Sequence, residues 1–166
     1  MASQLTVDNI VGATTSDEIH IPGHVVQVLQ DVRTTTYTQT APGSLTYDTV
    51  QSVTITPISN TSKILLRVNY GFGDSSAAGS GLVTRFQRGT TTIADYNVFW
   101  ASSNNGTGPH YDSASHEFLD SPATASAITY NFQVASQSGG DTIYYNSTFS
   151  NHSNMIATLT AMEIAQ

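Results

Sequence analysis

Apolar and polar residues alternate with a period of two along most of this chain. The clearest alternation runs from Ile64 to Tyr70, from Ile128 to Val134 and from Ile156 to Ile164. Shorter or weaker runs cover residues 50–56, 82–86, 92–100, 115–119 and 142–149. This period is typical of β-strands, and no long segment repeats every 3.6 residues as a helix would. Eight or more short strands predict an all-β fold, an antiparallel β-sandwich of the jelly-roll type.

Polar stretches rich in Gly, Ser, Asn and Asp separate these runs. Residues 73–81 predict a flexible loop between two strands, and residues 138–141 are short enough to close a hairpin. Residues 102–113 predict a longer polar loop. Binding functions concentrate in long polar loops on compact β-domains, so this loop is the first candidate for a binding site.

The N-terminal stretch differs from the rest of the chain. Its apolar positions are scattered, whereas a continuous apolar run begins near residue 24. We therefore expect an extended arm over residues 1–23 and one β-sandwich domain over residues 24–166. Because so short an arm cannot bury its own apolar side chains, we expect it to contact a partner subunit or a larger assembly. The candidate contact residues are Leu5, Val7, Ile10, Ile19, Ile21, Val25 and Val28. An ordinary first strand of the domain remains the alternative.

Composition and charge narrow the classes of partner. Only 10% of the residues are charged, while 24 are Thr and 20 are Ser, which suits strands that face water through hydroxyl groups. The net charge of −7 argues against binding nucleic acid or an anionic membrane surface. No apolar run is long enough for a transmembrane helix, and we expect no signal peptide. Without cysteine there are no disulfides, so oligomerisation is the expected source of extra stability.

Aromatic and amide residues gather around the long polar loop. Aromatic faces stack on sugar rings, and amide side chains bind sugar hydroxyls, so this set predicts contact with a glycan. The candidate ligand-binding residues are Trp100, Asn104, Asn105, His110 and Tyr111. A place in the core or in a subunit interface is the alternative for Trp100, as it is for most large aromatic residues.

The chain shows no catalytic pattern. Ser, His and Asp are all present, but a Gly-x-Ser-x-Gly elbow is not, and Glu117 with Asp120 forms no recognisable glycosidase pair. We interpret Asp120 as a turn residue whose carboxylate accepts backbone N–H bonds next to Pro122. We therefore expect a protein that is not an enzyme and that needs no cofactor.

No metal site is expected either. His20 and His24 have a ligand spacing only on a helix, which the intervening Pro22 prevents. Three copies of one histidine around a trimer axis are the single alternative. His110 and His116 are expected to be exposed or hydrogen-bonded loop histidines, with loop ligands or pH-sensitive contacts as the alternative.

Five sequence blocks carry a resemblance to a known family. They are HVVQVLQ at residues 24–30, VTITPISNTSKILL at 53–66, FLDSPATASAITYNFQ at 118–133, YYN at 144–146 and TAMEIA at 160–165. Together they resemble a domain family found in tail-fibre and other virion proteins of bacteriophages, cyanophages among them. The resemblance covers about residues 24–166 and is weakest over residues 88–116. It implies β-sandwich modules on virion surfaces, commonly trimeric, and it implies no catalytic residues.

These observations lead to one expected function and one alternative. We expect a non-enzymatic homotrimer on the exterior of a phage particle, assembled in the host cytoplasm. As a tail-fibre or fibre-tip protein, it would attach to tail or baseplate proteins through its arm and contact a host surface glycan through its loops. The alternative is a trimeric cement protein that decorates the head and binds the major capsid protein.

Overall fold

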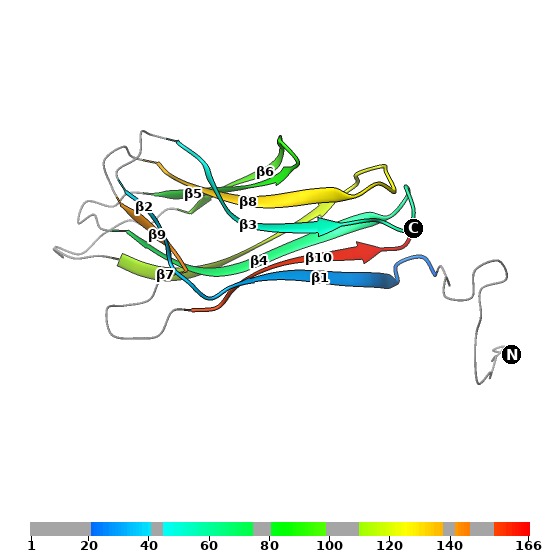
Figure 1. The fold of residues 1–166 in the computed structure, drawn as a ribbon, viewed down its shortest axis with the longest axis horizontal. Helices are drawn as coiled ribbons and strands as arrows, with labels where there is room; N and C mark the ends of the chain where they lie inside the picture. Colours follow the sequence, from blue (N-terminus) through cyan, green and yellow to red (C-terminus); the bar gives the residue numbers. More distant parts are fainter. Residues whose placement is uncertain (1–20, 41–44, 75–80, 99–109, 138–141, 147–154) are drawn as a thin grey trace, which may run out of the picture.

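The computed structural model describes residues 21–40, 45–74, 81–98, 110–137, 142–146 and 155–166, which form ten strands in two antiparallel sheets (Figure 1). The strands are β1 (Val25–Arg33), β2 (Tyr37–Gln39), β3 (Asp48–Ile55), β4 (Lys63–Asp74), β5 (Leu82–Arg88), β6 (Thr91–Val98), β7 (His110–Asp120), β8 (Ile128–Ser136), β9 (Ile143–Tyr145) and β10 (Ala157–Ile164).

The first sheet, called sheet A, is in effect four strands wide. Its order is β1-β10-β4-β9-β2, with β7 on the other side of β4. β10 pairs with residues 63–69 of β4 and β9 with residues 72–74, so β9 and β10 lie end to end beside it. β1 and β2 pair with β10 and β9 in the same way. Sheet B has the order β3-β8-β5-β6.

The pairing of strands is that of a jelly roll. β1 pairs with β10, β3 with β8, β4 with β7 and β5 with β6, always antiparallel. The chain is thus one long nested hairpin, closed between β5 and β6 by Gly89, whose φ of 58° favours glycine. Rolling up such a hairpin produces two sheets packed face to face. The predicted all-β jelly-roll sandwich is therefore confirmed.

Alternating apolar residues fill the space between the two sheets. Every second residue of β4 and β8 is buried, as the sequence alternation predicted. Aromatic rings meet within sheet A and across the sandwich. The ring centroid of Tyr70 lies 5.1 Å from that of Tyr145 in the same sheet and 5.2 Å from that of Phe132 in sheet B. Each such buried side chain stabilises the fold by roughly 1.5–3 kcal/mol.

The sandwich has two distinct ends. β1 begins and β10 finishes at one end, where Val25 pairs with Ile164; we call it the terminal end (Figure 1). At the opposite end, called the loop end, Asp74 of β4 pairs with both His110 and Ile143. In sheet B, Leu82 pairs there with Val98 and Ser136.

Several predicted boundaries need correction. β7 already begins at His110, so residues 110–113 of the predicted long loop are strand, and β4 continues to Asp74 inside the loop predicted over residues 73–81. The hairpin predicted at residues 138–141 is wrong, because the strands on either side, β8 and β9, belong to different sheets. β8 lies in sheet B and β9 in sheet A.

Asp120 is not a turn residue with a carboxylate bound to neighbouring backbone. The side chain points between the sheets and accepts hydrogen bonds from Arg88 Nη1 at 3.1 Å and from the Tyr130 hydroxyl at 2.7 Å. Asp120 is only 7% exposed, so the ion pair with Arg88 neutralises a carboxylate that burial would otherwise destabilise. This contact joins the end of β7 to the end of β5.

Candidate functional site

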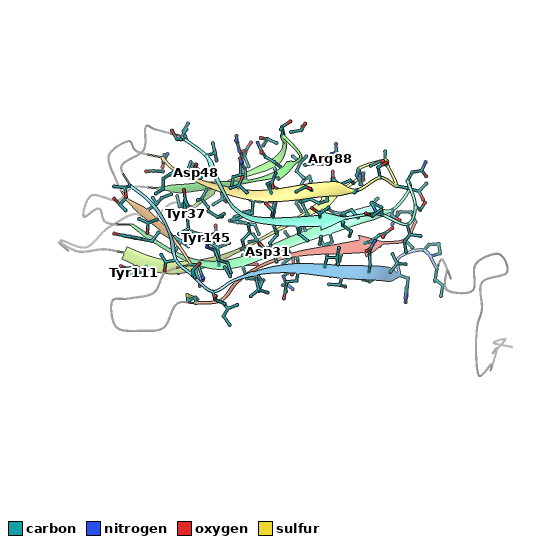
Figure 2. All side chains as sticks on the ribbon, in the orientation of Figure 1. Asp31, Tyr37, Asp48, Arg88, Tyr111 and Tyr145 are labelled. Atoms are coloured by element: carbon teal, nitrogen blue, oxygen red, sulfur yellow. The ribbon has the colours of Figure 1, made fainter. Side chains whose placement is uncertain are left out.

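The candidate functional site lies near the loop end, on the outer face of sheet A. Gly73 of β4 pairs with Tyr111 of β7 on one side and with Tyr144 of β9 on the other. The two tyrosine rings are stacked, with centroids 6.4 Å apart and planes inclined by 26°. Both tyrosines are half-buried, and Figure 2 shows Tyr111 at the loop end. Because Gly73 has no side chain, the two tyrosine rings on either side of it form most of this part of the outer face.

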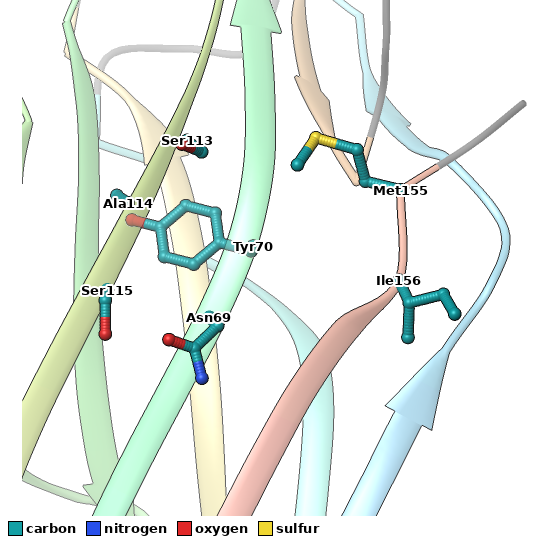
Figure 3. A pocket seen from close by; sticks show the side chains of 7 residues that line it. All are labelled: Asn69, Tyr70, Ser113, Ala114, Ser115, Met155 and Ile156. Atoms are coloured by element: carbon teal, nitrogen blue, oxygen red, sulfur yellow. The ribbon is translucent and has the colours of Figure 1, made fainter. Parts of the chain in front are cut away.

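Figure 3 shows a pocket of about 340 Å³ on sheet A. Its lining residue Ser113 lies two positions after Tyr111 in β7, so the pocket is next to the tyrosine pair and closer to the middle of the sheet. Its polar lining comes from Asn69 of β4 and from Ser113 and Ser115 of β7, and Asn69 pairs directly with Ser115. Met155 and Ile156, just before β10, form an apolar side and are 38% and 65% exposed. The remaining lining residues are Tyr70 and Ala114.

The strand geometry explains why these residues meet. Successive side chains of a strand point to opposite faces, so Tyr111, Ser113 and Ser115 share the outer face of β7. The facing residues of β4 are Gly73, Gly71 and Asn69, two of which lack side chains. The two glycines therefore leave a depression over β4, between the side chains of β7 and the segment that leads into β10.

The chemistry of this surface suits an uncharged polar ligand. Two hydroxyls and one amide can donate and accept hydrogen bonds, while a methionine and an isoleucine offer an apolar side. Among its lining residues the pocket has no carboxylate, histidine, lysine or arginine. Sugar rings have one apolar and several hydroxyl-bearing surfaces, so they match this combination. We call the pocket together with Tyr111 and Tyr144 the outer-face site.

Only part of the predicted ligand set falls in the part of the chain that the structure describes. Tyr111 lies in the outer-face site, and the backbone of His110 begins β7. Trp100, Asn104 and Asn105 lie outside the described residues. Sequence reasoning missed Tyr144, although two adjacent tyrosines in a short strand were a visible signal. No sequence signal distinguished the serines of β7, because hydroxyl residues occur throughout this chain.

Only some of the predicted assembly residues lie in the part of the chain that the structure describes. Ile21, Val25 and Val28 are 55%, 44% and 56% exposed. Leu5, Val7, Ile10 and Ile19 lie outside the described residues, as does most of the predicted arm. The first strand begins at Val25, one residue after the predicted start of the domain.

The two acidic residues considered as a glycosidase pair point away from each other. Glu117 lies on the outer face of β7 and forms an ion pair with Arg67 at 2.9 Å, whereas Asp120 is buried between the sheets. Within the described ranges, no three His, Cys, Asp or Glu residues gather where they could hold a metal ion.

His116 is an interior residue rather than a loop histidine. Its ring stacks on that of Tyr96, with centroids 4.2 Å apart, and its Nε2 lies 3.0 Å from the Tyr70 hydroxyl. Burial lowers the pKa of His116 below its ordinary value, because the charged imidazolium loses contact with water.

Comparisons with known proteins give only distant structural likenesses. No family model and no curated protein matches the sequence. A structure of infectious bursal disease virus, Gx strain, aligns with a TM-score of 0.43 at 12% identity, over 100% of this chain and 41% of that one. The dimeric latent PorU of Porphyromonas gingivalis aligns with a TM-score of 0.41 at 10% identity, over 87% of this chain and 14% of that one.

A third likeness is to the enzymatically active domain of tailspike protein 4 from bacteriophage CBA120. It has a TM-score of 0.23 at 17% identity and covers 74% of this chain and 20% of that one. The chain thus spans less than half the length of each of the three proteins. Likenesses this distant assign neither family nor activity. In the part of the chain that is described, no helix is long and apolar enough to cross a membrane.

Proposed function

We propose that this chain is a non-enzymatic structural protein of a phage particle, a tail-fibre or fibre-tip protein that binds a host surface glycan. In this role the N-terminal arm attaches the protein to tail or baseplate proteins, and the loop end faces the host. The five sequence blocks that resemble phage fibre domains support the virion role.

The observation that carries the proposal is the position of the outer-face site relative to the chain termini. The chain enters the sandwich at the terminal end, and the site lies toward the loop end. A protein held by its N-terminal arm would therefore present the site away from its attachment point. A jelly roll by itself carries no such argument, because the fold serves many unrelated functions.

Glycan binding at this surface would be weak for one copy. The pocket is shallow and near the lower end of the roughly 300–1,000 Å³ usual for ligand sites. Several copies held together would raise the overall affinity by avidity, without any new contact. We therefore propose a homotrimer as the binding form.

The first experiment measures binding of the protein to host surface polysaccharide. Replacing both Tyr111 and Tyr144 by Ala should reduce binding at least tenfold, because each lost stacking contact contributes on the order of 1 kcal/mol. The matched control is Tyr47→Ala, which removes an aromatic ring that packs on Arg85, 3.7 Å away. Circular dichroism checks that each variant remains folded. Unchanged binding by a folded double variant would refute the site.

The second experiment locates the protein on intact particles by immunogold labelling with an antibody against residues 24–166. Label on the tail or its tip supports the proposal. Label spread over the head overturns it in favour of a capsid cement protein. Light scattering of the purified protein measures the assembly, and a mass equal to one chain at micromolar concentration would refute the homotrimer.

A further inference from the structure

One row of apolar side chains crosses the whole outer face of sheet A. Val28 of β1 pairs with Met162 of β10, Met162 with Leu65 of β4, and Leu65 with Leu119 of β7. Val28 and Leu119, at the two edges, are 56% and 46% exposed, while Met162 and Leu65 are half-buried. We call these four residues the apolar row.

The apolar row is one part of a larger exposed patch at the terminal end. Val25 and Ile164 form the next apolar pair on the side of the chain termini, and Val25 is 44% exposed. The neighbouring row toward the loop end is polar, with Gln30 bonded to Thr160 and Arg67 paired with Glu117. A polar row therefore borders the patch on the side of the loop end. Contiguous exposed apolar side chains of this kind mark interaction surfaces more often than isolated ones do.

The outer face of sheet B differs in character from that of sheet A. There the rows are bonded polar pairs: Thr54 with Thr129 at 2.8 Å, and Ser52 with Asn131 at 2.7 Å. The contrast between the two outer faces argues that the apolar row is covered in the assembled protein.

The N-terminal arm of the same molecule does not fit the row as a simple extra strand. Ile21 to His24 form a turn in which the His24 N–H donates to the Ile21 carbonyl at 2.9 Å, with Gly23 at a φ of 83°. Such a Pro-Gly turn is of type II, which does not match the twist of a hairpin. A hairpin closed there would also pair Val28 with Asp17, placing a charge against the row.

The apolar positions of the arm lie farther from this turn in the sequence. In an extended segment Leu5, Val7 and Val11 would share one side, because side chains alternate. Nine mostly polar residues, 12–20, separate them from Ile21 and span about 30 Å when extended. The apolar row is about 14 Å wide at three strand spacings, a width that about five extended residues cover. The linker is long enough to place this segment on an adjacent copy.

We propose that the apolar row is the docking surface for residues 5–11 of the N-terminal arm of a second copy. This inference rests on the homo-oligomer of the proposed function and adds the surface through which its copies join. The arms then link subunits at the terminal end and leave the outer-face site of each copy open.

Disulfide trapping tests the proposal directly, because the natural chain contains no cysteine. The full-length Val7→Cys/Val28→Cys variant should give bands at two and three times the 17.7 kDa chain mass on non-reducing gels after mild oxidation. The Asp17→Cys/Val28→Cys variant reports on the hairpin within one chain and should not cross-link. The Val7→Cys/Thr54→Cys variant places the second cysteine on the polar face of sheet B and should remain largely uncross-linked.

A second variant tests the role of the apolar row in assembly without introducing cysteine. Leu119→Asp puts a charge at the exposed end of the row, and light scattering should show loss of the oligomer. Thr54→Asp, an exposed substitution on sheet B, should keep the wild-type mass. A cross-link within one chain, equal cross-linking at Thr54, or no cross-link in a wild-type-like oligomer would each overturn the inference while leaving the homo-oligomer in place. A monomeric wild-type protein would refute both.

Discussion

Replacing Glu163 by Gln tests whether a buried carboxylate holds the terminal end of the sandwich together. Glu163 lies in β10 and is completely buried. Its carboxylate accepts a hydrogen bond from the Gln27 amide of β1 at 2.5 Å and another from the Ile58 N–H at 2.8 Å. The residue therefore ties the first and last strands to the segment between β3 and β4.

The expected loss of stability follows from these contacts. Each hydrogen bond to a charged group contributes roughly 1.5–3 kcal/mol, and the glutamine amide would turn an NH₂ group toward one of the two donors. We expect Glu163→Gln to lower the free energy of unfolding by about 2–4 kcal/mol, a large part of the 5–15 kcal/mol typical of a domain. The matched control is Glu117→Gln, because the side chains of the Arg67–Glu117 pair are each 51% exposed. An exposed pair contributes about 0–1 kcal/mol.

The pH dependence provides a second measure of the same effect. Burial by itself would raise the pKa of Glu163, but the hydrogen bonds that its carboxylate accepts favour the ionised form and leave the pKa below its ordinary value of 4.5. A lowered pKa contributes stability that is complete above the unfolded-state pKa and is lost as the pH falls through the folded-state pKa. The difference between wild type and Glu163→Gln should thus stay constant above about pH 5 and shrink below it.

Urea denaturation at several pH values measures both effects. If Glu163→Gln loses no more stability than Glu117→Gln at neutral pH, the Glu163 carboxylate does not stabilise the terminal end of the sandwich. A difference between wild type and Glu163→Gln that grew on acidification would refute the sign of the pKa shift.

Three further predictions concern buried polar groups elsewhere. Tyr145→Phe removes the hydroxyl that donates to the buried Gln51 side chain, and should cost about 1–3 kcal/mol in urea denaturation. Arg88→Gln removes the cation that donates a hydrogen bond to the buried Asp120, and should cost about 1.5–3 kcal/mol by the same measurement. Because burial lowers the pKa of His116, its protonation opposes folding, so stability should fall as the pH drops below 6.5 toward the folded-state pKa. His116→Gln should flatten that part of the pH profile.

Matched substitutions control each of these predictions. Tyr144→Phe alters a half-buried tyrosine next to Tyr145 and should change stability by less than about 0.5 kcal/mol. Arg67→Gln removes the cation of the exposed pair and should cost no more than about 1 kcal/mol. Equal losses for Tyr145→Phe and Tyr144→Phe, or for Arg88→Gln and Arg67→Gln, would contradict the argument from burial. A pH profile that His116→Gln leaves unchanged would assign the titration to another group.

Local pattern was enough to predict the strands and the fold class. Runs such as Ile64–Tyr70 and Ile128–Val134 alternate because one face of each strand packs between the sheets, and that rule acts within a single segment. Pattern failed where both faces of a strand are polar. Residues 110–113 resemble a loop in sequence, yet they extend β7 because β4 offers them backbone partners as far as Asp74.

Alternation also left open which face of β10 is buried. Met162 and Ile164 made the even-numbered face look apolar, but the structure buries the odd-numbered face, Glu163 included. The small residues Ala157 and Ala161 lie against the opposite sheet, and a buried carboxylate is tolerated because donors from two other segments meet it. Those donors come from positions 27 and 58, which no local pattern connects to residue 163.

Both proposed surfaces depend on register between strands that are distant in sequence. The apolar row joins residues 28, 65, 119 and 162, and the outer-face site joins residues near 70, 113, 144 and 155. The sequence alone determined the strands, the all-β class and the low charge of this protein, since these follow from composition and short-range alternation. Only the tertiary structure decided which side chains of different strands lie next to one another, because the register between strands distant in sequence depends on long-range packing and turn geometry that no single segment specifies.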